Sequence, residues 1–207
     1  AAIPNVFVTA HDAMVTQAEI KSNEAILITA GSSGVGSAAI QIARHLGAKH
    51  ILATTRSSQK SAALKQLGAT EVIDTTDPNW PEQVLDITAG INVVIDQVGG
   101  DLFADCLKTM AVRGRYVTVG RNAGSHSNLN LDHVAKQRLS LIGVTFRTRT
   151  KREALACSSN FASDLLAAFD TGFLYPVVDK TFALDDLELA HHYMQSNQQI
   201  GKIVLVP

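Results

Sequence analysis

Short runs of consecutive apolar residues alternate along the chain with longer stretches in which apolar positions recur every three or four residues. The short runs are typical of buried strands, and the longer stretches are typical of amphipathic helices. Strands are predicted at residues 25–29, 50–55, 71–74, 92–97, 115–119 and 139–145. Helices are predicted at residues 4–19, 37–46, 57–67, 80–88 and 101–111. Strands that alternate with helices and are apolar throughout indicate a parallel sheet covered on both faces.

This alternation predicts an α/β fold, a Rossmann doubly wound six-stranded parallel sheet with strand order 3-2-1-4-5-6. After it come a long helix at residues 153–171 and a strand-helix-strand unit within residues 177–206. This unit is surplus to a nucleotide-binding sheet, so we interpret it as a remnant of a second domain. We expect a Rossmann domain with its lead-in and trailing helices over residues 1–172. Residues 173–207 are expected to belong to a catalytic domain that is otherwise missing.

The first candidate for chemistry is the Thr-Ala-Gly-Ser-Ser-Gly-Val-Gly segment at residues 29–36, between the first strand and a helix. A tight turn at this place brings free N–H groups of a helix N-terminus against a diphosphate. The spacing follows G-x-G-x-x-G with Ser33 in the place of the middle glycine. Gly34 and Gly36 are expected to let the backbone approach a ligand or a strand. Because strand, helix and next strand are all in place, we favour dinucleotide binding over a plain turn.

The end of the second strand indicates which dinucleotide is bound. An NAD site usually has an acidic side chain here, whereas this chain has Arg56 and Lys60 and no acid before Glu71. A guanidinium can grip the 2′-phosphate of NADP(H) with two hydrogen bonds, and a lysine adds a point charge. The sequence therefore predicts NADP(H). The alternative is that both cations are solvated charges at the start of a helix.

A similar glycine loop marks the short-chain dehydrogenases, whose chemistry requires a lysine four residues after a tyrosine. None of the three tyrosines is followed by a lysine at that spacing. The sequence therefore excludes this family.

A series of further motifs follows the order of another family. They lie at residues 1–4, 9–10, 30–36, 67–69, 96–100, 119–120, 147–149, 190–194 and 200–205. With these motifs the chain resembles the zinc-independent quinone oxidoreductase branch of the medium-chain dehydrogenase/reductase superfamily. In that family an N-terminal GroES-like catalytic domain precedes the segment seen here, so we interpret the chain as a fragment that lacks it.

The resemblance implies where each part of the cofactor would lie. Ser33, Gly34, Val35 and Gly36 would contact the diphosphate, Arg56 and Lys60 the adenosine phosphate, and Thr75 the adenine side. The nicotinamide would lie at the ends of strands four to six, at Gly99, Gly100, Gly120, Arg121, Asn122, Val144, Thr145 and Phe146. All these positions are expected at the carboxyl edge of the sheet, where doubly wound folds bind their ligands.

The resemblance also implies an activity, an NADPH-dependent reduction of a quinone or another α,β-unsaturated carbonyl by hydride transfer. No catalytic residue and no metal ligand set can be named in this chain, which is expected to be mainly the cofactor-binding part. The alternatives are a zinc-type alcohol dehydrogenase or an enoyl reductase of the same superfamily, and a non-catalytic NADPH-binding sensor or structural protein. In relatives the sixth strand pairs across a two-fold axis, so a homodimer through residues 139–145 is expected.

The charge and the apolar runs of the chain argue against two classes of partner, nucleic acids and membranes. A formal net charge of -1 argues against a nucleic-acid partner, and no apolar run is long enough for a membrane partner. The two cysteines, Cys106 and Cys157, lack metal-ligand spacing and suit a reducing, cytoplasmic compartment. Cys106 is expected in the core, and Cys157 is allowed to be exposed. For the adjacent His191 and His192 we favour a surface or packing role over metal binding.

Overall fold

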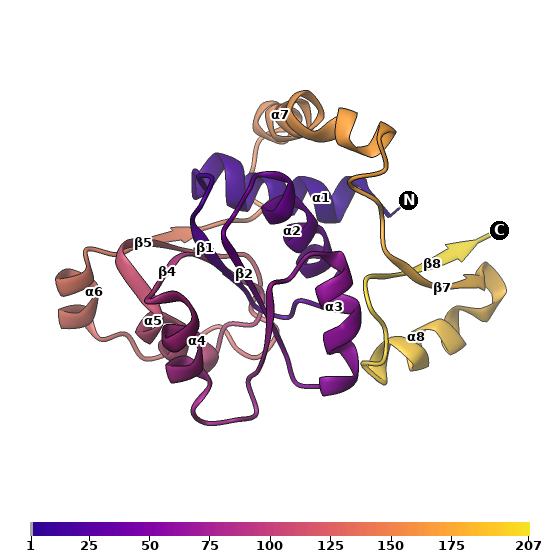
Figure 1. The fold of residues 1–207 in the computed structure, drawn as a ribbon. Coiled ribbons are helices and arrows are strands. Elements are labelled where there is room, and N and C mark those ends of the chain that lie inside the picture. Colours follow the sequence, from indigo (N-terminus) through magenta and orange to yellow (C-terminus); the bar gives the residue numbers. More distant parts are fainter. Residues whose placement is uncertain (1) are drawn as a thin grey trace.

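The computed structural model describes residues 2–207. It contains a six-stranded parallel sheet with strand order β3-β2-β1-β4-β5-β6 (Figure 1). The strands are β1 (Ala25–Ile28), β2 (His50–Thr55), β3 (Glu71–Asp74), β4 (Ile91–Asp96), β5 (Met110–Thr118) and β6 (Ser140–Gly143). The predicted doubly wound Rossmann sheet and its strand order are confirmed.

Helices cover both faces of this sheet (Figure 1). They are α1 (Pro4–His11), the π-helical η1 (Asp12–Gln17), α2 (Gly34–His45), the 3₁₀ turn η2 (Ser58–Lys60), α3 (Ser61–Leu67), α4 (Trp80–Thr88), α5 (Leu102–Lys108) and α7 (Lys151–Asp170). Side chains alternate across a strand, so Ile26 and Ile28 of β1 pack in the core under α1, α2 and α7. Leu27 packs in the opposite core, under α4 and α5.

Several local predictions differ from the structure; α2 begins at Gly34 and not at residue 37, and β5 begins at Met110 and not at residue 115. The helix predicted over residues 101–111 ends at Lys108, because Met110 already pairs with Ile91 in the sheet. A further helix, α6 (Leu131–Gln137), was not predicted. It has only seven residues, none of them buried, which is too short a window to show a helical period, and it begins where the Asn130 side chain accepts a hydrogen bond from the amide of His133.

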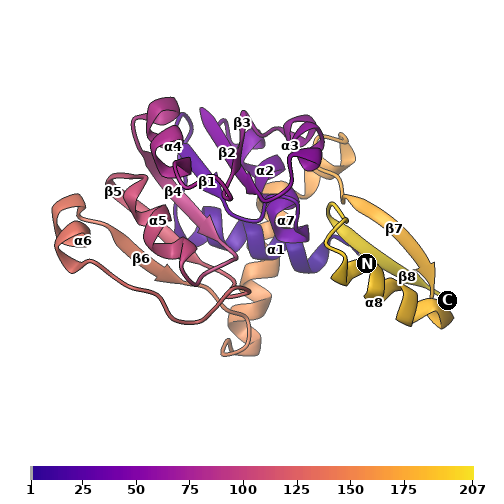
Figure 2. The same ribbon diagram turned by 90° about the horizontal axis from the view of Figure 1, so that it is seen from below.

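The chain after α7 forms its own small layer (Figure 2). Strands β7 (Val178–Ala183) and β8 (Lys202–Val206) pair in parallel, with the 3₁₀ turn η3 (Leu184–Asp186) and helix α8 (Leu187–Gln195) between them. This is the predicted strand-helix-strand unit, and it makes a two-stranded sheet separate from the main one. Within residues 2–207 no helix is long and apolar enough to cross a membrane.

Candidate functional site

The loop between β1 and α2 places backbone N–H groups of a helix N-terminus at the edge of the sheet. Ser33 is the N-cap of α2, and its hydroxyl accepts a hydrogen bond of 3.0 Å from the amide of Gly36. Within residues 2–207 the amide of Val35 has no hydrogen-bond partner, whereas Gly34 lies beside the bridge that Ser33 forms with Gly201. The positive end of the dipole of a twelve-residue helix adds to these donors. The geometry fits a diphosphate or another anion.

Two of the three glycines of this loop, Gly34 and Gly36, have different close neighbours. A Cβ at Gly36 would lie 2.4 Å from the carbonyl oxygen of Ala30, so only glycine permits the turn. A Cβ at Gly34 would lie 2.6 Å from Cδ of Lys202 and 2.9 Å from Cγ1 of Val6. The expectation that Gly34 makes room for a ligand or a strand of the sheet is therefore incomplete, because the lead-in helix and the C-terminal segment also occupy that space.

Asp96, at the end of β4, begins the motif at residues 96–100, but the sequence assigned it no role. Its Oδ1 accepts hydrogen bonds from the Thr29 hydroxyl (2.8 Å) and the Val98 amide (2.9 Å). Its Oδ2 accepts from the Gly99 amide (3.0 Å) and the Tyr116 hydroxyl (2.6 Å). A fully buried carboxylate needs such donors to replace water. The available signal was an acid directly after the apolar run of β4.

Gln97 connects this network to the phosphate loop. Its Oε1 accepts a hydrogen bond of 2.8 Å from the Ser33 hydroxyl, and its Nε2 donates to the Thr29 carbonyl at 2.9 Å. A glycine in place of Ser33 would lack the hydroxyl that ties the loop to β4. A Cβ at Gly120 would lie 2.4 Å from the Gln97 carbonyl oxygen. The residues that follow β5 therefore pack against Gln97 as well. The structure thus brings Ser33 and Gly120 together around Gln97.

The loops after β4 and β5 also meet. Gly99 and Gly100 both have positive φ (66° and 59°), and the amide of Gly100 donates to the carbonyl of Gly124 at 3.1 Å. The predicted residues Arg121 and Asn122 lie in the β5 loop with exposed side chains. After β6, Val144 is buried and Thr145 and Phe146 are half-buried. These predicted positions follow neighbouring parallel strands and therefore share the carboxyl edge.

At the adenosine end of the predicted site, Arg56 and Lys60 have different surroundings. Arg56 is exposed directly after β2, and half-buried Thr75 follows β3, with its amide bonded to the Thr55 carbonyl at 3.1 Å. Lys60 is half-buried, and its Nζ contacts the carbonyl oxygens of Asn197 and Gln199. Arg56 is open to a ligand, whereas Lys60 already has partners from the C-terminal segment.

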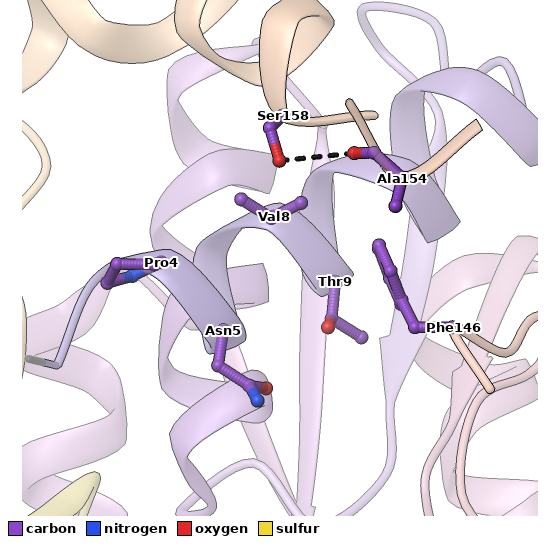
Figure 3. A pocket seen from close by; sticks show the side chains of 7 residues that line it. All are labelled: Pro4, Asn5, Val8, Thr9, Phe146, Ala154 and Ser158. Atoms are coloured by element: carbon purple, nitrogen blue, oxygen red, sulfur yellow. Dashed lines mark hydrogen bonds between the residues drawn. The ribbon is translucent and has the colours of Figure 1, made fainter. Parts of the chain in front are cut away.

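A pocket of about 410 Å³ opens between α1, α7 and the loop after β6 (Figure 3). Its lining is Pro4, Asn5, Val8, Thr9, Phe146, Ala154 and Ser158. It contains no charged side chain, and Phe146 is the one predicted site residue in it. Because Phe146 follows β6 in the chain, the pocket adjoins the nicotinamide end of the predicted site.

The remaining candidate side chains have structural surroundings. Cys106 is fully buried, as predicted, and burial raises the pKa of its thiol. Cys157, which the sequence left open to exposure, is also buried and lies beside the ion pair of Arg149 with Asp12. His192 is exposed. No group of three or more His, Cys, Asp or Glu within residues 2–207 is placed to hold a metal ion.

Comparison with known proteins decides the family. A model described as zinc-binding dehydrogenase matches residues 34–160, which is more than half of the chain. The chain belongs to the medium-chain dehydrogenase/reductase superfamily. The superfamily that the motifs resembled is thereby confirmed.

Several members of this superfamily are similar over the whole chain. Human quinone oxidoreductase is 31% identical over 209 residues, which cover 100% of this chain and 61% of the human protein. A solved NAD-dependent alcohol dehydrogenase is 32% identical, with a TM-score of 0.86, and the match covers 100% of this chain and 57% of that one. The JamJ enoyl reductase, solved in its apo form, is 28% identical with a TM-score of 0.86. The match covers 100% of this chain and 61% of the JamJ chain. The chain thus spans 57–61% of the length of these dehydrogenase-superfamily proteins.

Proposed function

We propose that this chain is the cofactor-binding part of an NADPH-dependent oxidoreductase that reduces a quinone or an α,β-unsaturated carbonyl. The observation that carries the proposal is the N-terminus of α2, with the amide of Val35 free within residues 2–207, at the carboxyl edge of a doubly wound sheet. The name of the human relative, quinone oxidoreductase, supports the reaction class.

The residues present fit a dinucleotide, which supplies the hydride when bound. Residues 33–36 would hold the diphosphate, and Arg56 would face the 2′-phosphate, with Thr75 on the adenine side. The nicotinamide would lie against Gly99, Gly100, Gly120, Arg121, Asn122, Val144, Thr145 and Phe146. The role of this chain is to bind the cofactor, orient its reactive face and exclude water. No residue of the chain is assigned to proton transfer.

Cofactor choice is tested by fluorescence titration with NADPH and NADH. The wild type is expected to bind NADPH more tightly, because the exposed Arg56 guanidinium matches a phosphate. Arg56→Gln should weaken NADPH binding at least about tenfold and leave NADH binding unchanged. Arg152→Gln, an exposed arginine on α7, is the matched control. Tighter binding of NADH would overturn the NADP preference, and binding of neither nucleotide would overturn the proposed function.

An enoyl reductase is the second candidate, supported by similarity to the JamJ enzyme. The apolar, uncharged pocket beside Phe146 suits the apolar part of either acceptor. Reduction assays with a quinone and with an enoyl thioester separate the two candidate functions. The assays compare residues 1–207 with a longer protein that also has the part found in the relatives. Residues 1–207 alone are expected to bind cofactor with little turnover, and rapid quinone turnover by them would contradict this expectation.

Exposed apolar residues on the C-terminal segment and on β6 support a domain division and a dimer. We assign residues 1–172 to the cofactor domain and residues 173–207 to a second domain, because β7 and α8 expose Val178, Leu187 and Met194. We expect a homodimer through residues 139–145, because β6 is an edge strand and Leu141 is 42% exposed. Both cysteines are free, which suits a cytoplasmic location.

A further inference from the structure

The loop between β6 and α7, residues 144–150, carries three residues of the predicted nicotinamide end, Val144, Thr145 and Phe146. We propose that Arg149 is a positioning residue that clamps this loop to the π-helical η1 and thereby fixes Thr145 and Phe146 beside the nicotinamide. The inference rests on the proposed dinucleotide function and deepens it, because it names a residue that acts on the reactive end of the cofactor through its neighbours.

The first observation is that Arg149 holds its own loop at two points. Its Nε donates a hydrogen bond of 3.1 Å to the carbonyl oxygen of Thr145. Its guanidinium carbon lies 4.7 Å from the centre of the Phe146 ring, where a cation is attracted to the face of the ring. One side chain therefore fixes both the backbone of Thr145 and the ring of Phe146.

The second observation is that the same guanidinium is tied to η1. Its Nη2 donates to Oδ2 of Asp12 at 2.6 Å, and its Nη1 donates to Oδ1 at 3.2 Å. The Asp12 side chain is 0% exposed and that of Arg149 is 15% exposed, so little water competes with this pair. Nη1 also contacts Sγ of Cys157 on α7. The loop is thus held to two helical segments, η1 and α7.

The third observation is that the clamp connects two sides of the pocket beside the nicotinamide end (Figure 3). Four of the lining residues belong to α1, and Phe146 is the lining residue from the loop. Asp12 begins η1, which directly continues α1, so the ion pair fastens the loop to the helical side of the pocket. Arg149 itself is not a lining residue, and its effect on the pocket passes through Phe146.

These contacts use the particular shape of arginine. A planar guanidinium can donate two hydrogen bonds to a carboxylate and stack on an aromatic ring, whereas a lysine ammonium keeps the charge without this geometry. Without the clamp, the loop would have to become ordered when the cofactor binds, which costs affinity. This cost should affect only ligands that carry a nicotinamide, because the predicted diphosphate and adenosine contacts follow β1, β2 and β3.

The test compares Arg149→Lys with Arg152→Lys, the same change at an exposed arginine of α7. The ligands are NADPH and 2′-phospho-ADP-ribose, which lacks the nicotinamide, and calorimetric titration of this chain gives both values of Kd. We expect Arg149→Lys to raise the Kd for NADPH about tenfold and to leave that for 2′-phospho-ADP-ribose unchanged. Without ligand, hydrogen exchange should become faster in peptides covering residues 144–150. Arg152→Lys should change none of these values.

A role of Arg149 in overall stability alone would not distinguish the two ligands. Equal weakening of both ligands by Arg149→Lys, or unchanged binding of both, would overturn the inference. So would equal affinity of the wild type for the two ligands, because the nicotinamide end would then add nothing to binding.

Two further outcomes are separable. If the wild type bound neither ligand, the proposed function would fail, and exchange in residues 144–150 would still decide whether Arg149 holds the loop. If Arg149→Lys unfolded, Asp12→Asn would take its place, because asparagine keeps the size of the partner while it removes the charge. It should show the same selective loss of NADPH binding, and equal loss of both ligands would overturn the inference.

Discussion

The phenol of Tyr116 donates a hydrogen bond of 2.6 Å to Oδ2 of Asp96, and the exposed fractions of these residues are only 1% and 0%. The bond joins β5 to the end of β4, where the predicted cofactor edge begins. Burial raises the pKa of Tyr116 far above its ordinary value, and the nearby Cys106 and Asp96 raise it further. Tyr116 therefore stays protonated and remains a donor to the carboxylate.

Tyr116→Phe removes this donor while it keeps the ring that packs edge-on against Phe103. We expect the free energy of unfolding to fall by about 1–3 kcal/mol, because a buried carboxylate loses one of its four hydrogen bonds. Urea unfolding followed by circular dichroism measures the change. Tyr175→Phe, at a position that is 45% exposed, is the control and should be nearly neutral. Equal stability of the two variants would contradict the structural role of the pair.

Gly36→Ala tests the geometry of the phosphate loop. The added Cβ would lie 2.4 Å from the Ala30 carbonyl oxygen and 2.8 Å from Cα of Gly31, which are backbone atoms that cannot rotate away. A loss of about 1–3 kcal/mol in stability is expected, together with weaker nucleotide binding. Gly143→Ala has no atom within 4 Å of its added Cβ and should leave both measurements unchanged. Normal nucleotide binding by Gly36→Ala would show that the loop adapts.

The pair of Glu24 and Arg115 predicts a pH dependence. Burial alone would raise the pKa of Glu24, but hydrogen bonds from Arg115 and from the amide of Lys21 outweigh it, so this pKa lies below its ordinary value of 4.5. A carboxyl group whose pKa is lowered by folding adds stability above its unfolded pKa. That stability is lost as the pH falls through the folded value.

Glu24→Gln should therefore lower the free energy of unfolding by about 1–2 kcal/mol at neutral pH. The difference from the wild type should shrink once the pH falls below 4.5, the ordinary pKa of this carboxyl. Urea titrations across that range give the profile. Glu82→Gln removes an exposed carboxylate without an ion pair within residues 2–207 and serves as the control. A difference that persisted to the lowest pH would argue against the ion pair as its source.

The proposed dimer predicts a change in mass. Leu141→Lys places a charge on the open edge strand β6 and should convert a dimer into a monomer, because charged edges resist pairing. Light scattering at micromolar concentration reports the mass, and circular dichroism checks the fold. Leu155→Lys, on α7 at a position that is 70% exposed, should leave the dimer intact. A wild-type protein that is already monomeric would refute the dimer.

Strong local patterns allowed much of the fold to be predicted. The bounds of β2, β3 and α4 match the prediction, because their apolar positions and flanking residues carry the signal in a short window. Helix α6 was missed, since its seven residues are too short a window to show such a period. The end of α5 was predicted too late, because the pairing of Met110 with Ile91 across the sheet overrides the local helical pattern.

The sequence by itself determined the doubly wound sheet, the turn at residues 29–36 and the presence of two cations after the second strand. These features depend on residues close together in the chain. Only the tertiary structure shows the hydrogen-bond partners of Asp96 and Lys60. The partners of Asp96 include Thr29, 67 positions away, and Lys60 meets carbonyls 137 and 139 positions away. Backbone carbonyls carry no residue identity, so no sequence pattern could show that they would surround this lysine.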